Sequence, residues 1–313
     1  MAGLKINRFL IVGWVLSLPL WAAVDNENIC ARRVKLGQIY SLLKERDVRA
    51  LVLDLDYTLA SLRRPIGEEV VKQLFEINAR GINICIITGA MEENVEWRVL
   101  SPIREYAARY GKKFDWSKFF LFTNTGSSGY RFDSSGNAVR FFHHTFTPGQ
   151  SAEVKRAVES FRQKYGEDSI TEEYVKEGKY TMYFKHTGKE SISEYVEFFR
   201  KKLSWLGLNI TAAGNRESID ITVCHKGIAI TTLQKLLNLD SEKIMVVGDS
   251  FVDEFANDRH MVQGNVLVFN AGEPASRDLE GRIFDLEDYF PFLPPGPSRT
   301  SLLLKLFIET LEE

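Results

Sequence analysis

Apolar residues along the chain follow two spacings, which predict an alternation of strands and helices. Short, nearly continuous apolar runs lie in residues 49–56, 82–90, 243–249 and 265–272. Strands that are apolar without alternation are typical of parallel sheets covered on both faces. Residues 67–81 and 227–239 instead carry apolar positions at helical spacing, with Gly81 placed to cap the first of these helices. The pattern predicts an α/β fold with an open, parallel, Rossmann-like sheet.

A different pattern occupies the middle of the chain. Helical spacing in residues 151–166 and 191–207 is mixed with strand-like segments at 179–186, 208–214 and 218–224. This order predicts a small α+β domain inserted into the larger sheet domain. We therefore expect a core formed by residues 34–145 and 224–313, with the insert in residues 146–223.

The N-terminal segment, residues 1–33, is set apart by its hydropathy. Lys5 and Arg8 precede an apolar stretch, residues 9–24, that ends before Asp25. Its length fits the apolar region of a signal peptide and is short of the roughly 20 residues that a spanning helix needs. The residues at the expected cleavage positions are bulky, so an uncleaved membrane anchor is an alternative to a cleaved signal peptide. A helix packed on the domain is the third alternative. We expect an exported protein or membrane attachment through residues 9–24, with a cytoplasmic protein as the alternative.

Composition narrows the class of protein further. The 313 residues are 44% hydrophobic and 26% charged, which is typical of a globular protein with a sizeable core. The formal net charge of −2 gives no indication of nucleic-acid binding. Cys30, Cys85 and Cys224 are widely spaced, so they predict neither a disulfide framework nor a zinc site.

The residues that could take part in catalysis or bind a ligand lie where the predicted strands end and the helices begin. They are Asp54, Asp56, Thr88, Gly89, Lys226, Asp249 and Asp253. In an open α/β sheet, ligands bind outside the carboxyl ends of the strands, so we expect these residues to meet at one rim. Gly89 opens a predicted helix, whose first backbone N–H groups can hold a phosphate.

Carboxylates gathered in this way need a cation among them. An all-oxygen set of aspartates suits Mg²⁺ when substrate phosphate and water complete its coordination. An aspartate can also attack phosphorus and form an aspartyl-phosphate, while a second acid protonates the leaving oxygen. An ammonium and a hydroxyl can stabilise the charge of the transferring phosphoryl group. The sequence therefore predicts metal-assisted phosphoryl transfer.

Four motifs in order resemble those of the haloacid dehalogenase (HAD) superfamily. They are DLDYTL at 54–59, the strand-end threonine of IITG at 86–89, HKG at 225–227 and GDSFVDE at 248–254. The resemblance implies a magnesium-dependent phosphatase with a Rossmann-like core. It implies that Asp54 is the nucleophile and Asp56 the general acid/base, and that Thr88 and Lys226 hold the phosphoryl group. The metal would contact Asp54, Asp56 through its backbone carbonyl, and Asp249, with Asp253 either as a further ligand or as a hydrogen-bond partner of the ligands.

The insert lies between the second and third motifs, where it resembles a type C2 cap in its C2B form. Such caps are found on sucrose-phosphate and trehalose-phosphate phosphatases, phosphomannomutases and Cof-like phosphatases, so the resemblance implies a sugar phosphate substrate. We expect Lys179 to contact the substrate. Other polar candidates at the ends of the cap strands are Lys185, His186, Asn215, Arg216 and Glu217. A sugar phosphomutase and a non-catalytic, membrane-tethered binding protein are the alternatives that the sequence leaves open.

Overall fold

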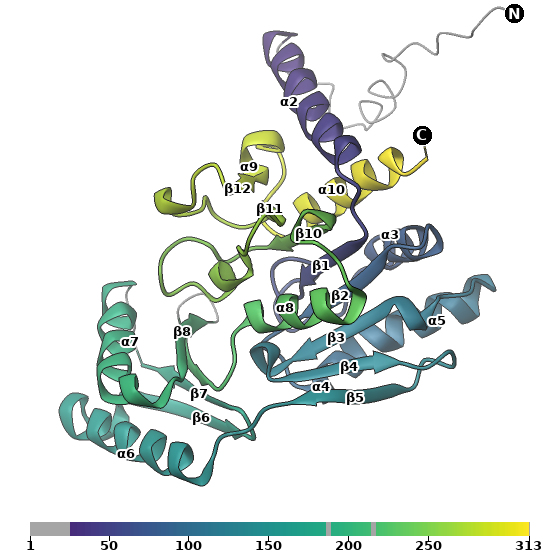
Figure 1. The fold of residues 1–313 in the computed structure, drawn as a ribbon. Helices are drawn as coiled ribbons and strands as arrows, with labels where there is room; N and C mark the ends of the chain where they lie inside the picture. The colour runs from purple at the N-terminus through teal and green to yellow at the C-terminus, as the bar shows by residue number, and fades with distance from the viewer. Residues whose placement is uncertain (1–25, 186–188, 214–216, 313) are drawn as a thin grey trace, which may run out of the picture.

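The computed structural model describes residues 26–185, 189–213 and 217–312, and within them an eight-stranded sheet forms the centre of the larger domain (Figure 1). Its strands, in spatial order, are β12 (Ile283–Asp285), β11 (Leu267–Asn270), β10 (Ile244–Gly248), β1 (Ala50–Asp54), β2 (Asn83–Ile87), β3 (Phe119–Thr123), β4 (Ser128–Phe132) and β5 (Ala138–His143). The strands from β12 to β3 are parallel, and β4 and β5 pair in the antiparallel direction. The predicted α/β class with a Rossmann-like parallel sheet is confirmed.

Helices cover both faces of this sheet, which explains why its strands are apolar without alternation. The longer ones are α2 (Asn26–Glu45), α3 (Glu68–Ala79), α5 (Ser101–Tyr110), α8 (Lys226–Leu237) and α10 (Pro297–Thr310). Leu51 and Leu53 of β1 face the cluster that includes α3, α5 and α10, whereas Ala50 and Val52 face the cluster that includes α8. All residues of β1 and β10 are consequently buried.

Short helical segments join these elements. They are α4 (Glu92–Val95), the π-helical η2 (Glu96–Leu100), η3 (Trp116–Lys118), η4 (Asn124–Gly126), η5 (Glu167–Ser169), η6 (Ser204–Leu206), η7 (Ser241–Lys243), η8 (Asn257–Met261), η9 (Arg277–Leu279) and α9 (Leu286–Tyr289). The segments α4, η2 and α5 follow one another without a break, so a π-helical turn lies inside one continuous helix. Two of these segments, η2 and η8, carry residues of the candidate site described below.

A second, four-stranded sheet forms the cap. Its antiparallel strands are, in spatial order, β6 (Ile170–Lys176), β7 (Lys179–Phe184), β9 (Ser218–Thr222) and β8 (Asn209–Ala213). Helices α6 (Pro148–Tyr165) and α7 (Lys189–Leu203) pack on one face, where Phe161 and Phe199 stack with their ring centroids 5.1 Å apart. Thr181 and Asp220 lie on the opposite face and line a cavity shared with the core. The cap therefore presents its polar face to the larger sheet.

The chain enters the cap from β5 and leaves it into α8. Hydrogen bonds join the cap to the core: the Ala212 N–H donates to the Phe255 carbonyl over 3.0 Å, and Lys179 Nζ donates to the Gly89 carbonyl over 3.1 Å. The second of these contacts lies next to the loop that follows β2. The cap consequently stands over the carboxyl ends of the parallel strands.

The N-terminal part of the chain bears on the predicted membrane attachment. Residues 9–24, the predicted export or anchoring segment, lie outside the described residues. Among the helices that are described, none combines the length and apolar character needed to span a bilayer. Helix α2 begins at Asn26, directly after the residues that are not described.

Candidate active site

The carboxyl end of β1 carries the first two candidate residues on a tight turn. Asp54 ends the strand, and the chain reverses so that the Tyr57 N–H donates to the Ala60 carbonyl over 2.7 Å. Tyr57 adopts a left-handed backbone conformation with φ of 58°. Non-glycine residues in this conformation are held there by their surroundings and cluster at functional sites. Gly296 contributes to these surroundings, because a Cβ on it would lie 2.7 Å from the Tyr57 carbonyl oxygen.

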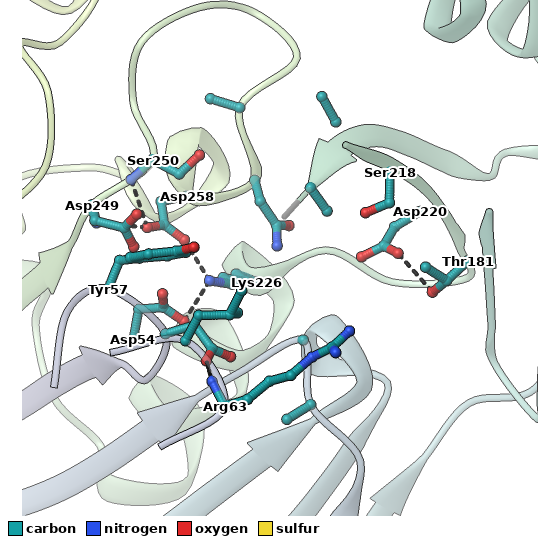
Figure 2. A pocket seen from close by; sticks show the side chains of 18 of the residues that line it. Asp54, Tyr57, Arg63, Thr181, Ser218, Asp220, Lys226, Asp249, Ser250 and Asp258 are labelled. Carbon is teal, nitrogen blue, oxygen red and sulfur yellow. Dashed lines mark hydrogen bonds and ion pairs between the residues drawn. The ribbon is translucent and has the colours of Figure 1, made fainter. Parts of the chain in front are cut away.

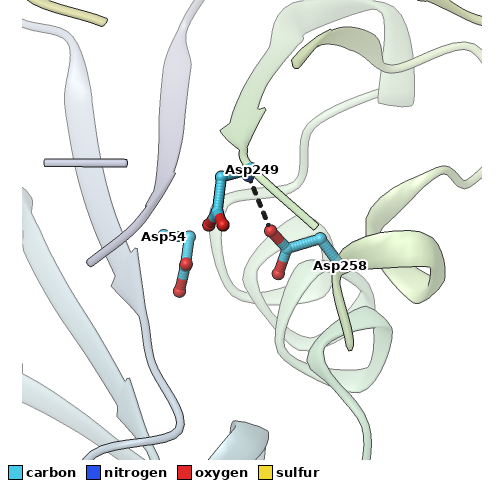
Figure 3. Close-up of side chains that lie close together, drawn as sticks. All are labelled: Asp54, Asp249 and Asp258. Atoms are coloured by element: carbon cyan, nitrogen blue, oxygen red, sulfur yellow. Dashed lines mark hydrogen bonds between the residues drawn. The ribbon is translucent and has the colours of Figure 1, made fainter. Parts of the chain in front are cut away.

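Three carboxylates from different elements meet beside this turn (Figure 3). Asp54 comes from β1, Asp249 follows β10, and Asp258 lies in η8. One oxygen from each lies within 4.8 Å of the others. Asp258 is fully buried, and its Oδ2 accepts the Asp249 N–H over 2.9 Å and the Ser250 N–H over 3.1 Å. Gly248 permits this approach, since a Cβ there would lie 2.5 Å from Asp258 Oδ2.

Lys226 supplies positive charge to this group of carboxylates (Figure 2). It is the first residue of α8 and is 2% exposed. Its Nζ lies 2.6 Å from Asp54 Oδ1 and 2.5 Å from Asp258 Oδ1. Burial by itself lowers the pKa of Lys226, but the charges of Asp258 and Asp54 outweigh burial and raise it above its ordinary value. Lys226 is therefore a permanent cation at this site.

One ammonium does not balance the carboxylates. Burial raises the pKa of Asp54 from 3.8 to about 7, although Lys226 opposes the shift. Burial, followed by the charges of Asp258 and Asp54, also raises the pKa of Asp249 well above its usual range. A divalent cation would relieve both shifts, and an all-carboxylate oxygen set is the donor chemistry that Mg²⁺ prefers. The residues present therefore fit a magnesium ion.

Asp56 lies apart from this acidic group and is held by an arginine. Both of its oxygens accept from Arg98, with Nη2 2.5 Å from Oδ1 and Nη1 3.2 Å from Oδ2. The Asp56 side chain remains 26% exposed, whereas that of Arg98 is 3% exposed. Asp56 also lines the cavity that Asp54 faces. The two predicted catalytic aspartates therefore open into one cavity, with different partners.

The loop after β2 carries the predicted phosphate-binding residues. Thr88 is fully buried, and its Oγ1 accepts the Ala90 N–H over 3.0 Å. Gly89 and Ala90 line the cavity, while Thr88 is not among the described residues that do so. The helix expected from Gly89 begins later, at Glu92. Gly89 thus presents loop backbone to the cavity.

The cap contributes a buried lysine to the same cavity. Lys179 Nζ lies 2.5 Å from Asp220 Oδ2, and Thr181 Oγ1 donates to Asp220 Oδ1 over 2.7 Å. Burial, and after it the charge of Lys179, lowers the pKa of the neighbouring Lys176 to about 8. Lys185 and Glu217 are exposed and are absent from the described residues that line the cavity. His186, Asn215 and Arg216 lie outside the described residues.

The cavity itself lies between the core and the cap and has a volume of about 810 Å³. Of the residues predicted from the sequence, those that line it are Asp54, Asp56, Gly89, Lys179, Lys226, Asp249 and Asp253. Its walls combine these charged groups with exposed aromatic side chains from both domains. A single space therefore collects the residues that the strand-end pattern indicated.

Asp258 is the residue of the acidic group that the sequence interpretation missed. The segment GDSFVDE predicted Asp253 as a metal ligand or a partner of the ligands. In the structure, Asp253 Oδ1 accepts the Phe255 N–H over 2.9 Å, and among the described residues the carboxylates close enough to share an ion are those of Asp54, Asp249 and Asp258. The available signal was the pair Asn257 and Asp258, which follows β10 at a greater distance. Asp258 lies close to Asp249 because the intervening segment, residues 250–256, loops out and returns.

No protein-family model matches the sequence, and no curated protein sequence is significantly similar to it. Solved structures are similar in fold. IMP-bound IMP-nucleotidase of Plasmodium falciparum superposes with a TM-score of 0.64 and 16% identity, over 92% of this chain and 75% of that one. A HAD/COF-like hydrolase from Plasmodium vivax gives a TM-score of 0.59 and 16% identity, over 87% of this chain and 99% of that one.

Protein 0175 of Thermoplasma acidophilum gives a TM-score of 0.54 and 18% identity, over 83% of this chain and 98% of that one. Each of these similarities covers more than four fifths of this chain. The chain therefore has the fold of the HAD-like hydrolases, with a small antiparallel sheet as its cap.

Proposed function

We propose that this protein is a magnesium-dependent phosphomonoesterase that hydrolyses a small phosphate ester through an aspartyl-phosphate. The observation that carries the proposal is the group formed by Asp54, Asp249, Asp258 and Lys226 at the floor of the cavity. Three carboxylates and one ammonium leave a negative charge that suits a divalent cation. Mg²⁺ held there would neutralise charge on the phosphoryl oxygens.

Asp54 is the proposed nucleophile. Its Oδ1 is bound by Lys226, which orients the carboxylate at the end of a rigid, buried strand. In the first step an Asp54 oxygen forms a bond to phosphorus as the bond from phosphorus to the leaving oxygen breaks. Lys226 keeps its proton and stabilises negative charge around the reacting group. The loop backbone at Gly89 is the proposed additional contact for the phosphoryl oxygens, next to Thr88.

Asp56 is the proposed acid and base. In the first step its proton moves to the leaving oxygen, and in the second step it takes a proton from the water that attacks the aspartyl-phosphate. The same carboxyl group serves both steps because each returns it to the form that the other requires. Its exposure to the cavity, where a leaving oxygen and a water molecule can reach it, supports this role.

The leaving group would lie against the cap. A sugar phosphate, the class indicated by the resemblance of the cap, would meet the polar face that carries Lys176, Lys179 and Thr181. A nucleoside monophosphate is the second candidate. Two observations favour it: the fold similarity to an IMP-nucleotidase, and the aromatic residues Trp97 and Tyr174, which are 46% and 44% exposed and line the cavity.

The test is phosphate release by the full chain from sugar phosphates, nucleoside monophosphates and 4-nitrophenyl phosphate, with Mg²⁺ and with EDTA. We expect release that requires Mg²⁺ and favours one of the two metabolite classes. Product analysis separates hydrolysis from a mutase, which would return the phosphoryl group to the sugar. A folded protein that binds Mg²⁺ and releases no phosphate from any substrate would contradict the proposal and favour a non-catalytic binding role.

Replacing Asp258 and Asp253 in turn tests which of the two helps Asp54 and Asp249 to hold the metal ion. We expect Asp258→Asn to weaken Mg²⁺ binding by about 10- to 100-fold, because it removes one negative charge from the group around the ion. Asp253→Asn is the matched control and should change Mg²⁺ affinity less than threefold. Isothermal titration of each variant with Mg²⁺ measures both effects. The reverse order of affinities would return the role to Asp253.

A further inference from the structure

Arg98 makes an unusually complete set of contacts around Asp56. Its Nε donates to the Arg64 carbonyl over 2.9 Å, which leaves both terminal nitrogens directed at the carboxylate. The Arg98 carbonyl in turn accepts the Ile66 N–H over 2.9 Å. The guanidinium is thus anchored through Nε to the loop that follows the turn at residues 54–60, and its two terminal nitrogens contact Asp56.

Burying the charged side chain of Arg98 costs free energy, which suggests that the ion pair between Arg98 and Asp56 has a function. The side chain is 3% exposed, and a buried ion pair is often no more stable than apolar residues that fill the same volume. Asp56 and Arg98 both line the cavity, so the pair borders the space that the substrate would occupy. A bidentate arginine holds a carboxylate in one plane, which a lysine or a hydroxyl does not do.

The backbone conformation around Arg98 also indicates a functional role for this residue. Arg98 lies at the centre of the π-helical segment η2, Glu96–Leu100, between α4 and α5. A π-helical turn inside an α-helix is rare and frequently lies at a functional site. The wider turn changes the direction in which the following side chains leave the helix.

We propose that Arg98 is a positioning residue that fixes the Asp56 carboxyl group for proton transfer to the leaving oxygen and from water. The inference rests on the acid and base role proposed for Asp56. In the first step the Asp56 O–H bond breaks and the proton passes to the leaving oxygen. In the second step a water O–H bond breaks and the proton passes to Asp56, while Arg98 keeps all its protons throughout.

The dependence of the rate on the leaving group provides a readout that a purely structural role would not move. The ratio kcat/KM reports the steps up to departure of the leaving group. An alkyl phosphate needs a proton on its leaving oxygen, whereas 4-nitrophenolate departs without one. We expect Asp56→Asn to lower kcat/KM for an alkyl phosphate by about 10²- to 10⁴-fold and for 4-nitrophenyl phosphate by less than tenfold.

Arg98→Gln should reproduce this selectivity in weaker form, with a loss of about 10- to 100-fold on the alkyl phosphate and little loss on the aryl phosphate. Arg98→Lys keeps the charge and disturbs the buried site less, so it serves if the glutamine variant does not fold. Because lysine cannot bind both carboxylate oxygens in one plane, it should show the same selectivity. Arg104→Gln is the matched control, because Arg104 lies in the same continuous helix, is 42% exposed and pairs with Glu96. Its replacement should leave kcat/KM for both substrates unchanged.

Each outcome separates the two proposals. If Asp56→Asn affects both substrates equally, the acid role of Asp56 is wrong and the proposed mechanism fails with it. If Asp56→Asn is selective but both Arg98 variants lower the two rates equally or not at all, the mechanism stands and the role of Arg98 is overturned.

Discussion

Asp54→Asn is expected to abolish phosphate release, by about 10⁴-fold or more, while the protein remains folded. The amide cannot form the proposed acyl-phosphate bond as a carboxylate does, and removal of a nucleophile that acts with other groups has effects of this size. Phosphate release from the preferred substrate measures the loss. Incubation with ³²P-labelled substrate followed by acid quenching should label the wild-type protein and leave the variant unlabelled.

The fold should tolerate this replacement because the ionised carboxylate is itself costly at its position. Burial raises the pKa of Asp54 to about 7, so a neutral side chain of the same shape removes repulsion with Asp249 and Asp258. Thermal unfolding should therefore change little. Asp168→Asn, at an exposed position in the cap, is the matched control and should keep full activity. Normal turnover by Asp54→Asn would eliminate Asp54 as the nucleophile.

Lys226→Met should have the largest combined effect on stability and activity. Methionine matches the length of the lysine stem but leaves Asp54 and Asp258 without the ammonium that lies within 2.6 Å of both. Removing one partner of a buried ion pair costs about 3–5 kcal/mol, because the remaining charge is buried without compensation. Urea unfolding at neutral pH measures the change in the free energy of unfolding, and phosphate release should fall by at least about 10²-fold.

Magnesium provides an internal check on this explanation. If the lost stability reflects uncompensated carboxylates, Mg²⁺ should raise the free energy of unfolding more in Lys226→Met than in the wild-type protein. Lys235→Met, an exposed lysine in the same helix, is the control and should change the free energy of unfolding by less than about 0.5 kcal/mol. Equal stability of the two variants would contradict the ion-pair geometry.

The similarity to solved structures concerns the fold alone. The choice between the two proposed substrate classes depends on the cap and on the residues beside it at the cavity wall. Thr181 and Asp220 make its cavity face polar, while Trp97 and Tyr174 add aromatic surface at the cavity wall. Sugar hydroxyls and a planar base would use different parts of this surface. The substrate panel therefore tests which part contributes to binding.

The sequence by itself determined the architecture of the core and the location of its chemistry. Apolar runs without alternation predicted the buried parallel strands, because only a sheet covered on both faces buries every residue of a strand such as β1. The rule that ligands bind beyond the carboxyl ends of such strands then placed Asp54, Asp249 and Lys226 at one rim. Their positions follow from local spacing, since each lies directly at the end of a strand or the start of a helix.

Only the tertiary structure decided which further groups meet them. Asp258, and not Asp253, joins the acidic group, because its position depends on how residues 250–256 loop out and on hydrogen bonds to the backbone at Asp249 and Ser250. Arg98 reaches Asp56 across 42 residues of sequence from a π-helical turn that no periodicity indicates. Spacing along the chain predicts which residues end an element, whereas contacts between loops and distant elements depend on the packing of the whole fold.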